Sequence, residues 1–257
     1  MNLLAQLLSA LGRNAVPVAG VLAESWTTPA ALVLYWAESL IGALFNLARI
    51  AIHRARTRKR GHYRAQLGVR VGGGGRPGDS GRPLKTFLAE YAVGAFVFSG
   101  AHGLFLALIL LGVFHTAIDG RAIGLGIATL AGFELVAFVA DLPGIAERPF
   151  SWIRRRAQYS LGRVVLLQLV IIVGGGIAVF TESLNFFFYL FAGLKLLSDL
   201  AMAWNRGEEK ELPERPPAWA SAMMKKTHPG ESPDAWWDKE RRQQSEAKRR
   251  DEEALPA

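Results

Sequence analysis

Cysteine is absent from this chain of 257 residues. Without it the protein cannot form a disulfide framework, a thiolate zinc site or an iron–sulfur cluster, and it has no thiol nucleophile. Three common catalytic patterns are absent as well: H-E-x-x-H, G-x-S-x-G and the paired D-x-x-D that can hold magnesium on a lipid diphosphate. We therefore expect neither a cofactor nor a metal site. The absence of these patterns argues against an enzyme, although an enzyme is kept below as the third alternative.

Charge is scarce over most of the chain, whereas apolar residues are abundant. Hydrophobic residues make up 51% of the sequence, and most of them lie in long blocks between residues 3 and 204. A helix needs about 20 mostly apolar residues to cross the roughly 30 Å hydrocarbon layer of a bilayer. The segments that meet this requirement are residues 3–23, 30–52, 87–114, 122–142, 161–180 and 184–204. The sequence thus predicts an all-α fold, a polytopic transmembrane helix bundle with about six spans, and argues against a soluble domain.

The first of these segments is interrupted by polar residues. Arg13 and Asn14 lie in its middle, and Pro17 removes a backbone donor one turn later. The segment therefore either spans the membrane completely or forms a broken helix. A cleaved signal peptide is disfavoured because the first cation follows the apolar run instead of preceding it.

Basic residues are concentrated in two of the connections between these segments. Residues 53–85 contain ten Lys and Arg but only one acid, and residues 143–160 contain four arginines. In membrane proteins the cytoplasmic connections carry an excess of Lys and Arg. Both connections are therefore expected in the cytoplasm, and with six spans both termini are expected there too.

The net charge of +8 raises the question of a nucleic-acid partner, but the cations lie next to apolar segments. That placement favours a membrane surface, so we expect no nucleic-acid partner. The cations at the ends of the predicted spans are expected to contact anionic lipid headgroups: Arg54, Arg56, Arg58, Lys59, Arg60, Arg154, Arg155 and Arg156. Phe150, Trp152 and Ile153 lie beside the arginine triplet and suit an interfacial segment over residues 149–158.

The chain divides into two regions by composition. Residues 1–204 form the predicted transmembrane bundle. Within this region, the connection at residues 53–85 is expected to be a basic, glycine-rich cytoplasmic linker, because residues 71–83 cannot bury a core.

The second region, residues 205–257, contains 11 Lys and Arg and 12 Asp and Glu. This composition predicts a charged, largely disordered cytoplasmic tail. A short helix over residues 233–254 is compatible with it. Trp236 and Trp237 are the candidate contacts for a partner protein or for a second copy of the chain.

Polar residues lie inside the predicted spans, where an ionisable group costs at least about 2.5 kcal/mol on insertion scales. Such groups normally face the interior of a helix bundle or a water-filled cavity. We therefore predict an intramembrane polar site built from these residues: Glu38, Asn46, His102, Glu134, Lys195 and Asp199.

Helical spacing places several polar residues of the second span on one face. Gly42, Asn46 and Arg49 follow Glu38 at intervals of four, four and three residues. This stripe of small and polar residues either packs closely against a neighbouring helix or lines a wet path.

Spacing and depth also suggest two pairs. Lys195 and Asp199 are four residues apart on one helix face, so they either form a structural ion pair or contribute to the polar site. Glu38 and His102 lie at equal depth, by residue count, in neighbouring antiparallel spans. If they pair, the carboxylate raises the affinity of His102 for a proton; the alternative is a neutral imidazole bonded to a serine or a carbonyl.

Short strings that occur in order along the chain resemble a known family. They are Asn14 to Gly20, Tyr35-Trp36-x-Glu38, Phe45-Asn46, Ala101-His102-Gly103, Gly162-Arg163, Gly174 to Gly176, and Leu194-Lys195 with Asp199. Over residues 10–204 the chain resembles an uncharacterised family of bacterial multi-pass membrane proteins, known only as a domain of unknown function. The resemblance implies an integral membrane protein of the bacterial cytoplasmic (inner) membrane, and it supplies no activity. The chain departs from the family at Ser39, where relatives carry Asn, and at Gln168, where they often carry His.

Three functions are open at this point. Buried carboxylates, His102 and interrupted spans favour a small-solute or proton-linked transporter. The basic linker and the charged tail suit a membrane scaffold that binds lipid or a partner protein. The third alternative is an intramembrane lipid-modifying enzyme with Glu38 or Glu134 as its base.

Overall fold

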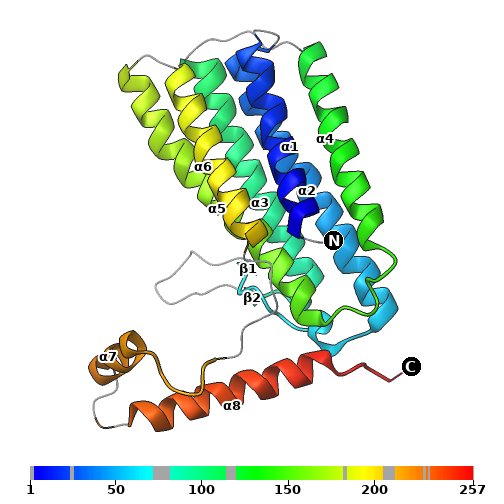
Figure 1. Cartoon of the computed structure of the whole chain (residues 1–257), viewed down its shortest axis with the longest axis vertical. Helices are drawn as coiled ribbons and strands as arrows, with labels where there is room; N and C mark the ends of the chain where they lie inside the picture. The colour runs from blue at the N-terminus through cyan, green and yellow to red at the C-terminus, as the bar shows by residue number, and fades with distance from the viewer. Residues whose placement is uncertain are drawn as a thin grey trace.

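Six long helices lie side by side in the computed structural model of the chain (Figure 1). The residues that the structure describes are 3–23, 26–71, 82–113, 120–181, 184–204, 212–227, 230 and 232–256. The long helices are α1 (Leu3–Leu22), α2 (Thr28–Thr57), α3 (Phe87–Ala107), α4 (Gly120–Asp141), α5 (Phe150–Thr181) and α6 (Leu184–Trp204). Helix α2 is central because it contacts each of the other five.

Short elements and two further helices lie at one end of this bundle (Figure 1). They are the 3-10 helix η1 (Arg60–Tyr63), the strands β1 (Arg70–Val71) and β2 (Arg82–Pro83), and the helices α7 (Ala218–Thr227) and α8 (Pro233–Glu252). The two strands pair antiparallel over two residues each, with Val71 opposite Arg82. A π-helix, Leu108–Val113, continues α3 at its other end. The chain is therefore all-α, as predicted, apart from this two-residue pairing.

Three helices of the described part are long and apolar enough to cross a membrane: Thr28–Thr57, Phe87–Gly112 and Ile123–Asp141. Their outward faces carry exposed apolar side chains, such as Leu104 on α3 and Val136 on α4. Soluble monomers rarely expose large contiguous apolar patches. These helices support the prediction of a membrane protein, and α1, α5 and α6 cover the other predicted spans.

Threonines begin two of the central helices. The Thr27 hydroxyl accepts a hydrogen bond from the Ala30 amide at 3.4 Å, and the Thr86 hydroxyl accepts one from the Ala89 amide at 3.2 Å. Both contacts satisfy amides that have no partner within the helix. Helix α2 ends where Arg58 takes the left-handed conformation, with φ 49°. This turn directs the chain across the end of the bundle.

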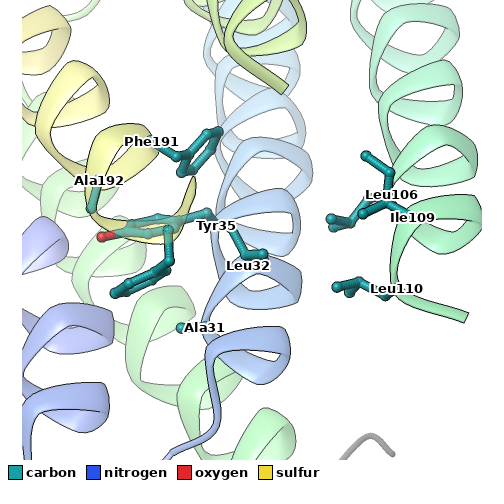
Figure 2. Packing of buried hydrophobic residues seen from close by; sticks show 9 residues of the cluster. Ala31, Leu32, Tyr35, Leu106, Ile109, Leu110, Phe191 and Ala192 are labelled. Atoms are coloured by element: carbon teal, nitrogen blue, oxygen red, sulfur yellow. The ribbon is translucent and has the colours of Figure 1, made fainter. Parts of the chain in front are cut away.

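Two clusters of buried side chains form the core. The first joins α2, α3 and α6 through residues such as Tyr35, Leu106 and Phe191, and Figure 2 shows the Tyr35 ring beside Phe191. The centroids of these two rings are 5.3 Å apart. The second cluster lies near the short elements and includes Phe87 and Phe150, whose rings meet edge to face. Aromatic contacts of this kind stabilise beyond the area they bury.

Glycines allow α2 to approach its neighbours closely. A Cβ atom at Gly103 of α3 would lie 2.7 Å from the Trp36 indole, and one at Gly126 of α4 would lie 2.5 Å from the Leu34 side chain. Real Cβ atoms essentially never lie so close to another heavy atom. A larger residue at either position would force the facing side chain of α2 to move, so both glycines favour the close approach of α2 to the two helices.

Helix α5 begins at Phe150, eleven residues before the predicted span 161–180. The expected interfacial segment over residues 149–158 is therefore mostly the first part of a long helix. Phe150 and Ile153 are buried in the second cluster instead of facing lipid headgroups. The reason is local: Arg154 and Arg156 have acidic partners inside the protein, described below, so this face of the helix turns inward.

The predicted linker is ordered at both of its ends. Both carboxylate oxygens of the buried Glu90 accept backbone amides from the chain after η1, with Leu67 at 2.9 Å and Val69 at 3.2 Å. The Gln66 amide donates to the same carboxylate. Residues 72–81, which hold the glycine run, lie outside the described residues.

The predicted tail contains two helices in its described part. The helix compatible with residues 233–254 is present as α8, which spans Pro233–Glu252. Trp237 is buried, and its indole N–H donates to the Pro213 carbonyl at 2.8 Å. The adjacent Trp236 ring lies against it, with centroids 6.0 Å apart. This part of the tail thus has structure of its own, and the tryptophans contribute to it.

Candidate functional site

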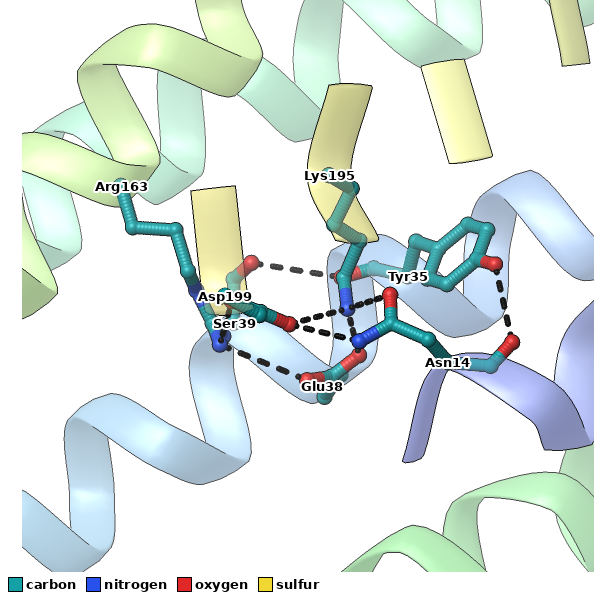
Figure 3. Close-up of polar contacts among 7 residues, drawn as sticks. All are labelled: Asn14, Tyr35, Glu38, Ser39, Arg163, Lys195 and Asp199. Atoms are coloured by element: carbon teal, nitrogen blue, oxygen red, sulfur yellow. Dashed lines mark hydrogen bonds and ion pairs between the residues drawn. The ribbon is translucent and has the colours of Figure 1, made fainter. Parts of the chain in front are cut away.

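Four charged side chains meet between the central helices (Figure 3). Glu38 comes from α2, Arg163 from α5, and Lys195 and Asp199 from α6. We call these four residues, together with Asn14 of α1, the central network. It connects α1 and α2 with α5 and α6, which begin more than 90 residues later in the sequence.

Each cation of the central network bridges both carboxylates. The Lys195 Nζ lies 2.9 Å from Glu38 Oε2 and 3.1 Å from Asp199 Oδ2. The Arg163 Nη1 lies 3.5 Å from Glu38 Oε1 and 3.2 Å from Asp199 Oδ1. Two positive and two negative charges therefore balance within one closed ring of ion pairs.

Asn14 of α1 adds two hydrogen bonds to this ring. Its amide nitrogen donates to Asp199 Oδ2 at 2.8 Å, and its amide oxygen accepts from Lys195 Nζ at 2.8 Å. The Tyr35 hydroxyl donates to the Asn14 carbonyl at 3.4 Å, and the Tyr35 ring lies 4.8 Å from Lys195 Nζ. Helix α1 is continuous through Pro17. Asn14 therefore binds Lys195 and Asp199 from within an unbroken helix.

Burial makes this network energetically demanding. Glu38 and Lys195 are 0% exposed. Among the described residues neither carboxylate oxygen of Glu38 accepts a hydrogen bond of regular geometry, so its charge is compensated by the two ion pairs. Removing one partner of such a group leaves an uncompensated buried charge, which is strongly destabilising. The network therefore depends on all four of its charges.

The structure brings together three of the six residues predicted as the intramembrane polar site. These are Glu38, Lys195 and Asp199. The sequence left open whether Lys195 and Asp199 form a separate ion pair or join a site, and the structure places both in the central network.

Asn46 lies in a second polar group on the same stripe of α2. Its side-chain oxygen accepts a hydrogen bond from Arg156 Nε at 2.9 Å. The Asp141 carboxylate lies 3.0 Å from Arg49 Nε and 3.2 Å from Arg156 Nη1. We call Asn46, Arg49, Asp141 and Arg156 the Asp141 cluster. The predicted stripe thus faces the arginines of α5.

Glu134 lies between these two groups. It is buried on α4, and its charge interacts with both Arg163 and Arg49. Gly42 lies on the stripe of α2. A Cβ atom built at Gly42 would lie 3.9 Å from Arg163 Nη2, so the stripe passes beside Arg163. Charged side chains therefore follow one another from the central network to the Asp141 cluster.

His102 is buried but does not pair with Glu38 in the described structure. Its Nδ1 atom has no hydrogen-bond partner among the described residues. On this side α2 presents Trp36 to α3, and the indole N–H donates to the Ser99 carbonyl at 2.8 Å. Glu38 instead faces α5 and α6. Equal depth had suggested the pair, but depth does not determine the rotation of a helix about its axis.

Two members of the central network were not predicted as site residues. Arg163 lies near the end of its predicted span, where a cation normally reaches toward the headgroups. Asn14 is uncharged and was interpreted as an interruption of α1. Both occur in the strings that carry the family resemblance, and that signal could have identified them.

Several of the cations predicted to contact lipid headgroups have partners within the chain. Arg54 lies over the Tyr63 ring at 4.6 Å, and Arg56 donates to the Leu142 carbonyl at 3.2 Å. Lys59, Arg60 and Arg154 pair with acids at the end of α8. These contacts do not test lipid binding, but they show that the basic surface is partly neutralised by the protein itself.

Two buried histidines lie at the junction of α2 and η1. His53 Nδ1 and His62 Nε2 are 2.7 Å apart, and the His62 ring packs against Phe87 and Phe150. Burial lowers the pKa of His62 to about 3, and the neighbouring His53 acts in the same direction. In the part of the chain that the structure describes, no group of three His, Cys, Asp or Glu residues is arranged to hold a metal ion.

Comparison with known proteins assigns the chain to a family. The model of the Family of unknown function (DUF6498) matches residues 2–217, so the chain belongs to that family. This result confirms the resemblance to an uncharacterised family. No curated protein and no solved structure matches the chain.

Proposed function

We propose that this member of a family of unknown function is a proton-linked membrane transporter for a small solute, with the central network as its coupling site. The observation that carries the proposal is the closed ring of two carboxylates and two cations, buried between α2, α5 and α6. Ionisable groups inside membrane proteins typically mark ion pathways and proton relays.

Protonation would change the connections within this ring. A proton on Glu38 removes the attraction of that side chain for Lys195 and Arg163, and Asp199 is then the one charged carboxylate of the central network for both cations. Because Arg163 and Asp199 lie on α5 and α6, these two helices stay joined. The link from α2 to them weakens. Proton binding thus favours a state in which α2 moves relative to α5 and α6.

The Asp141 cluster and Glu134 extend this site toward one end of the bundle. The membrane topology that accompanies the proposal has six spans, and both termini lie in the cytoplasm. The connections rich in Lys and Arg lie at the end of the bundle that α8 crosses, so the proposal takes this end as the cytoplasmic one. Charged groups then lead from the cytoplasmic end to Glu38.

The test is proton movement through purified protein in lipid vesicles. Vesicles that contain the dye pyranine are given a pH gradient, with potassium and valinomycin to fix the membrane potential. We expect wild-type protein to acidify the lumen faster than protein-free vesicles, and Glu38→Gln to abolish the difference. Glu90→Gln is the control, because it also removes a buried carboxylate but lies outside the central network and the Asp141 cluster.

A distance measurement tests the proposed movement of α2 on protonation and needs no solute. The chain has no native cysteine, so Leu44→Cys on α2 and Leu197→Cys on α6 give two specific spin labels at exposed positions. We expect their distance distribution to change between pH 8 and pH 5, and to stay constant in the Glu38→Gln background. Proton flux equal to that of empty vesicles, together with a pH-independent distance, contradicts the proposal.

The second candidate function is a membrane scaffold. It is favoured by the complete pairing of the four charges, since a fully compensated network is also suited to holding helices together. A scaffold predicts that Glu38→Gln lowers stability without affecting any proton movement. The vesicle and distance experiments separate the two functions.

A further inference from the structure

The acidic end of α8 is bound to the basic ends of α2 and α5. Asp251, Glu252 and Glu253 are consecutive, and each pairs with at least one cation from elsewhere in the chain. We call residues 251–253 the acidic latch. The latch contacts residues that are more than 90 positions earlier in the sequence. Glu252, for example, binds Phe150, which precedes it by 102 residues.

Glu252 occupies the N-terminus of α5. Its Oε2 accepts hydrogen bonds from the Phe150 amide at 2.9 Å and from Lys59 Nζ at 2.7 Å, and its Oε1 accepts one from the Ser151 amide at 3.1 Å. Amides at a helix start have no partner within the helix and attract anions. Burial acts to raise the pKa of Glu252, but the bonds from Lys59, Phe150 and Ser151 outweigh it and lower that pKa below its usual range.

The two neighbours of Glu252 strengthen this attachment. Asp251 is 4% exposed; it accepts a hydrogen bond from Gln66 Nε2 at 3.0 Å and lies 3.9 Å from Arg154 Nη1. Glu253 lies 3.4 Å from Arg60 Nη1, and its carbonyl accepts the Arg60 amide at 2.8 Å.

The backbone continues the contact beyond the acids. Ala254 forms an isolated antiparallel bridge with Lys59. The Leu255 amide donates to the Arg58 carbonyl at 3.0 Å. The latch is therefore held by backbone pairing as well as by charge.

The group that binds Glu252 is a complete set of donors for an anion: two helix-start amides and a lysine. The same set suits the oxygens of a phosphate group. The latch pairs with Lys59, Arg60, Arg64 and Arg154, and all of these except Arg64 were predicted from the sequence to contact anionic headgroups.

We propose that the acidic latch is an autoinhibitory contact that fills an anion site at the start of α5, and that the phosphate of an anionic lipid headgroup displaces it. Displacement frees Lys59 and the two α5 amides for the lipid and releases α8 from the bundle. This inference does not depend on the transport proposal, since it concerns only the end of the bundle that α8 crosses.

The experiment measures whether the latch is closed. Spin labels at Ala55→Cys and Ala254→Cys report the distance between the end of α2 and the residue that follows the latch; both positions are exposed. The full chain is placed in nanodiscs of phosphatidylcholine alone or with one third phosphatidylglycerol. We expect a short distance in phosphatidylcholine and a several-fold smaller short-distance fraction with phosphatidylglycerol.

Variants and a phosphate arm identify the cause. In phosphatidylcholine, Glu252→Gln should lower the ratio of closed to open protein by about tenfold, because charged hydrogen bonds are lost. Glu240→Gln, an exposed acid on the same helix, should leave it unchanged. Inorganic phosphate added to phosphatidylcholine nanodiscs distinguishes a free phosphate from a lipid headgroup as the competitor.

The outcomes separate the parts of the proposal. A Glu252→Gln protein as closed as the wild type overturns the latch. A short-distance fraction that is equal in both lipids overturns lipid competition. Opening by inorganic phosphate alone, with no effect of phosphatidylglycerol, also overturns it in favour of a soluble anion.

Discussion

Glu38 and Glu252 are both carboxylates that bind a lysine, at 2.9 Å and 2.7 Å respectively, yet their surroundings differ. Glu252 accepts two backbone amides in addition to its lysine. Glu38 has only cations as its partners among the described residues. Backbone amides cannot move away or lose a proton, whereas a side-chain cation can exchange one carboxylate for another. The first arrangement suits a fixed anion site whose occupant can be exchanged, and the second suits a rearrangement on protonation.

The largest effect that tests this comparison is expected from loss of the two lysines. Lys195→Met leaves the buried Glu38 and Asp199 to share Arg163, and we expect it to lower the free energy of unfolding by about 3–5 kcal/mol. Lys59→Met should cost only about 1 kcal/mol, because the α5 amides still bind Glu252 and the lysine is partly exposed. Unfolding in mixed detergent micelles measures both.

The double variant Lys195→Met with Glu38→Gln is the control for the first of these values. It should be more stable than Lys195→Met alone, since it removes the uncompensated charge together with its partner. If Lys195→Met and Lys59→Met lowered the free energy of unfolding equally, the proposed difference between the surroundings of Glu38 and Glu252 would be wrong.

A smaller effect is expected from the glycine that allows α2 and α3 to approach. Gly103→Ala places a Cβ 2.7 Å from the Trp36 indole, so we expect a loss of about 1–3 kcal/mol from overpacking. Gly100→Ala is the matched control, because nothing lies within 4 Å of a Cβ at that position of the same helix. Melting temperatures in one detergent compare the two, and an equal response would contradict the close packing.

The last effect is absent at neutral pH and concerns the junction of α2 and η1. The pKa of His62 is about 3 in the folded protein and near 6.5 when exposed, so below pH 6.5 the unfolded chain binds a proton that the folded protein does not. This contribution to stability is complete above pH 6.5 and decreases as the pH falls, by about 2 kcal/mol at pH 5. The nearby His53, Arg54 and Lys59 also lower the pKa of His62.

His62→Gln removes the titrating imidazole and should flatten the dependence of the melting temperature on pH between 7 and 5. A slope as steep as that of the wild type would show that another group is responsible. In either case, the pH response of His62 should be independent of Glu38, because the two lie in different parts of the molecule.

The helical architecture could be predicted from the sequence because each long helix has an apolar composition of its own. The central network could be predicted only in part. Charge inside a span identified Glu38, Lys195 and Asp199, but their partners depend on how each helix is rotated, as the separation of Glu38 from His102 shows. Arg163 was missed because its place near a span end is equally typical of a cation that reaches the headgroups.

The tail illustrates a different limit. Its composition predicts solvation, and this reasoning takes no account of a partner elsewhere in the same chain. Asp251 and Glu252 are ordered by Lys59, Arg154 and the start of α5. No local pattern in residues 205–257 indicates those contacts, since they are long-range.

The contact between α1 and α6 also has a consequence for biosynthesis. Asn14 precedes its partner Lys195 by 181 residues, and ribosomes add roughly 5–20 residues per second. The polar side chains of α1 and α2 therefore wait for roughly 10 to 35 seconds in or near the membrane before α6 arrives to complete the ring. During the first part of that interval, before Arg163 is made, the partly made chain carries Glu38 without either of the cations that neutralise it in the complete protein.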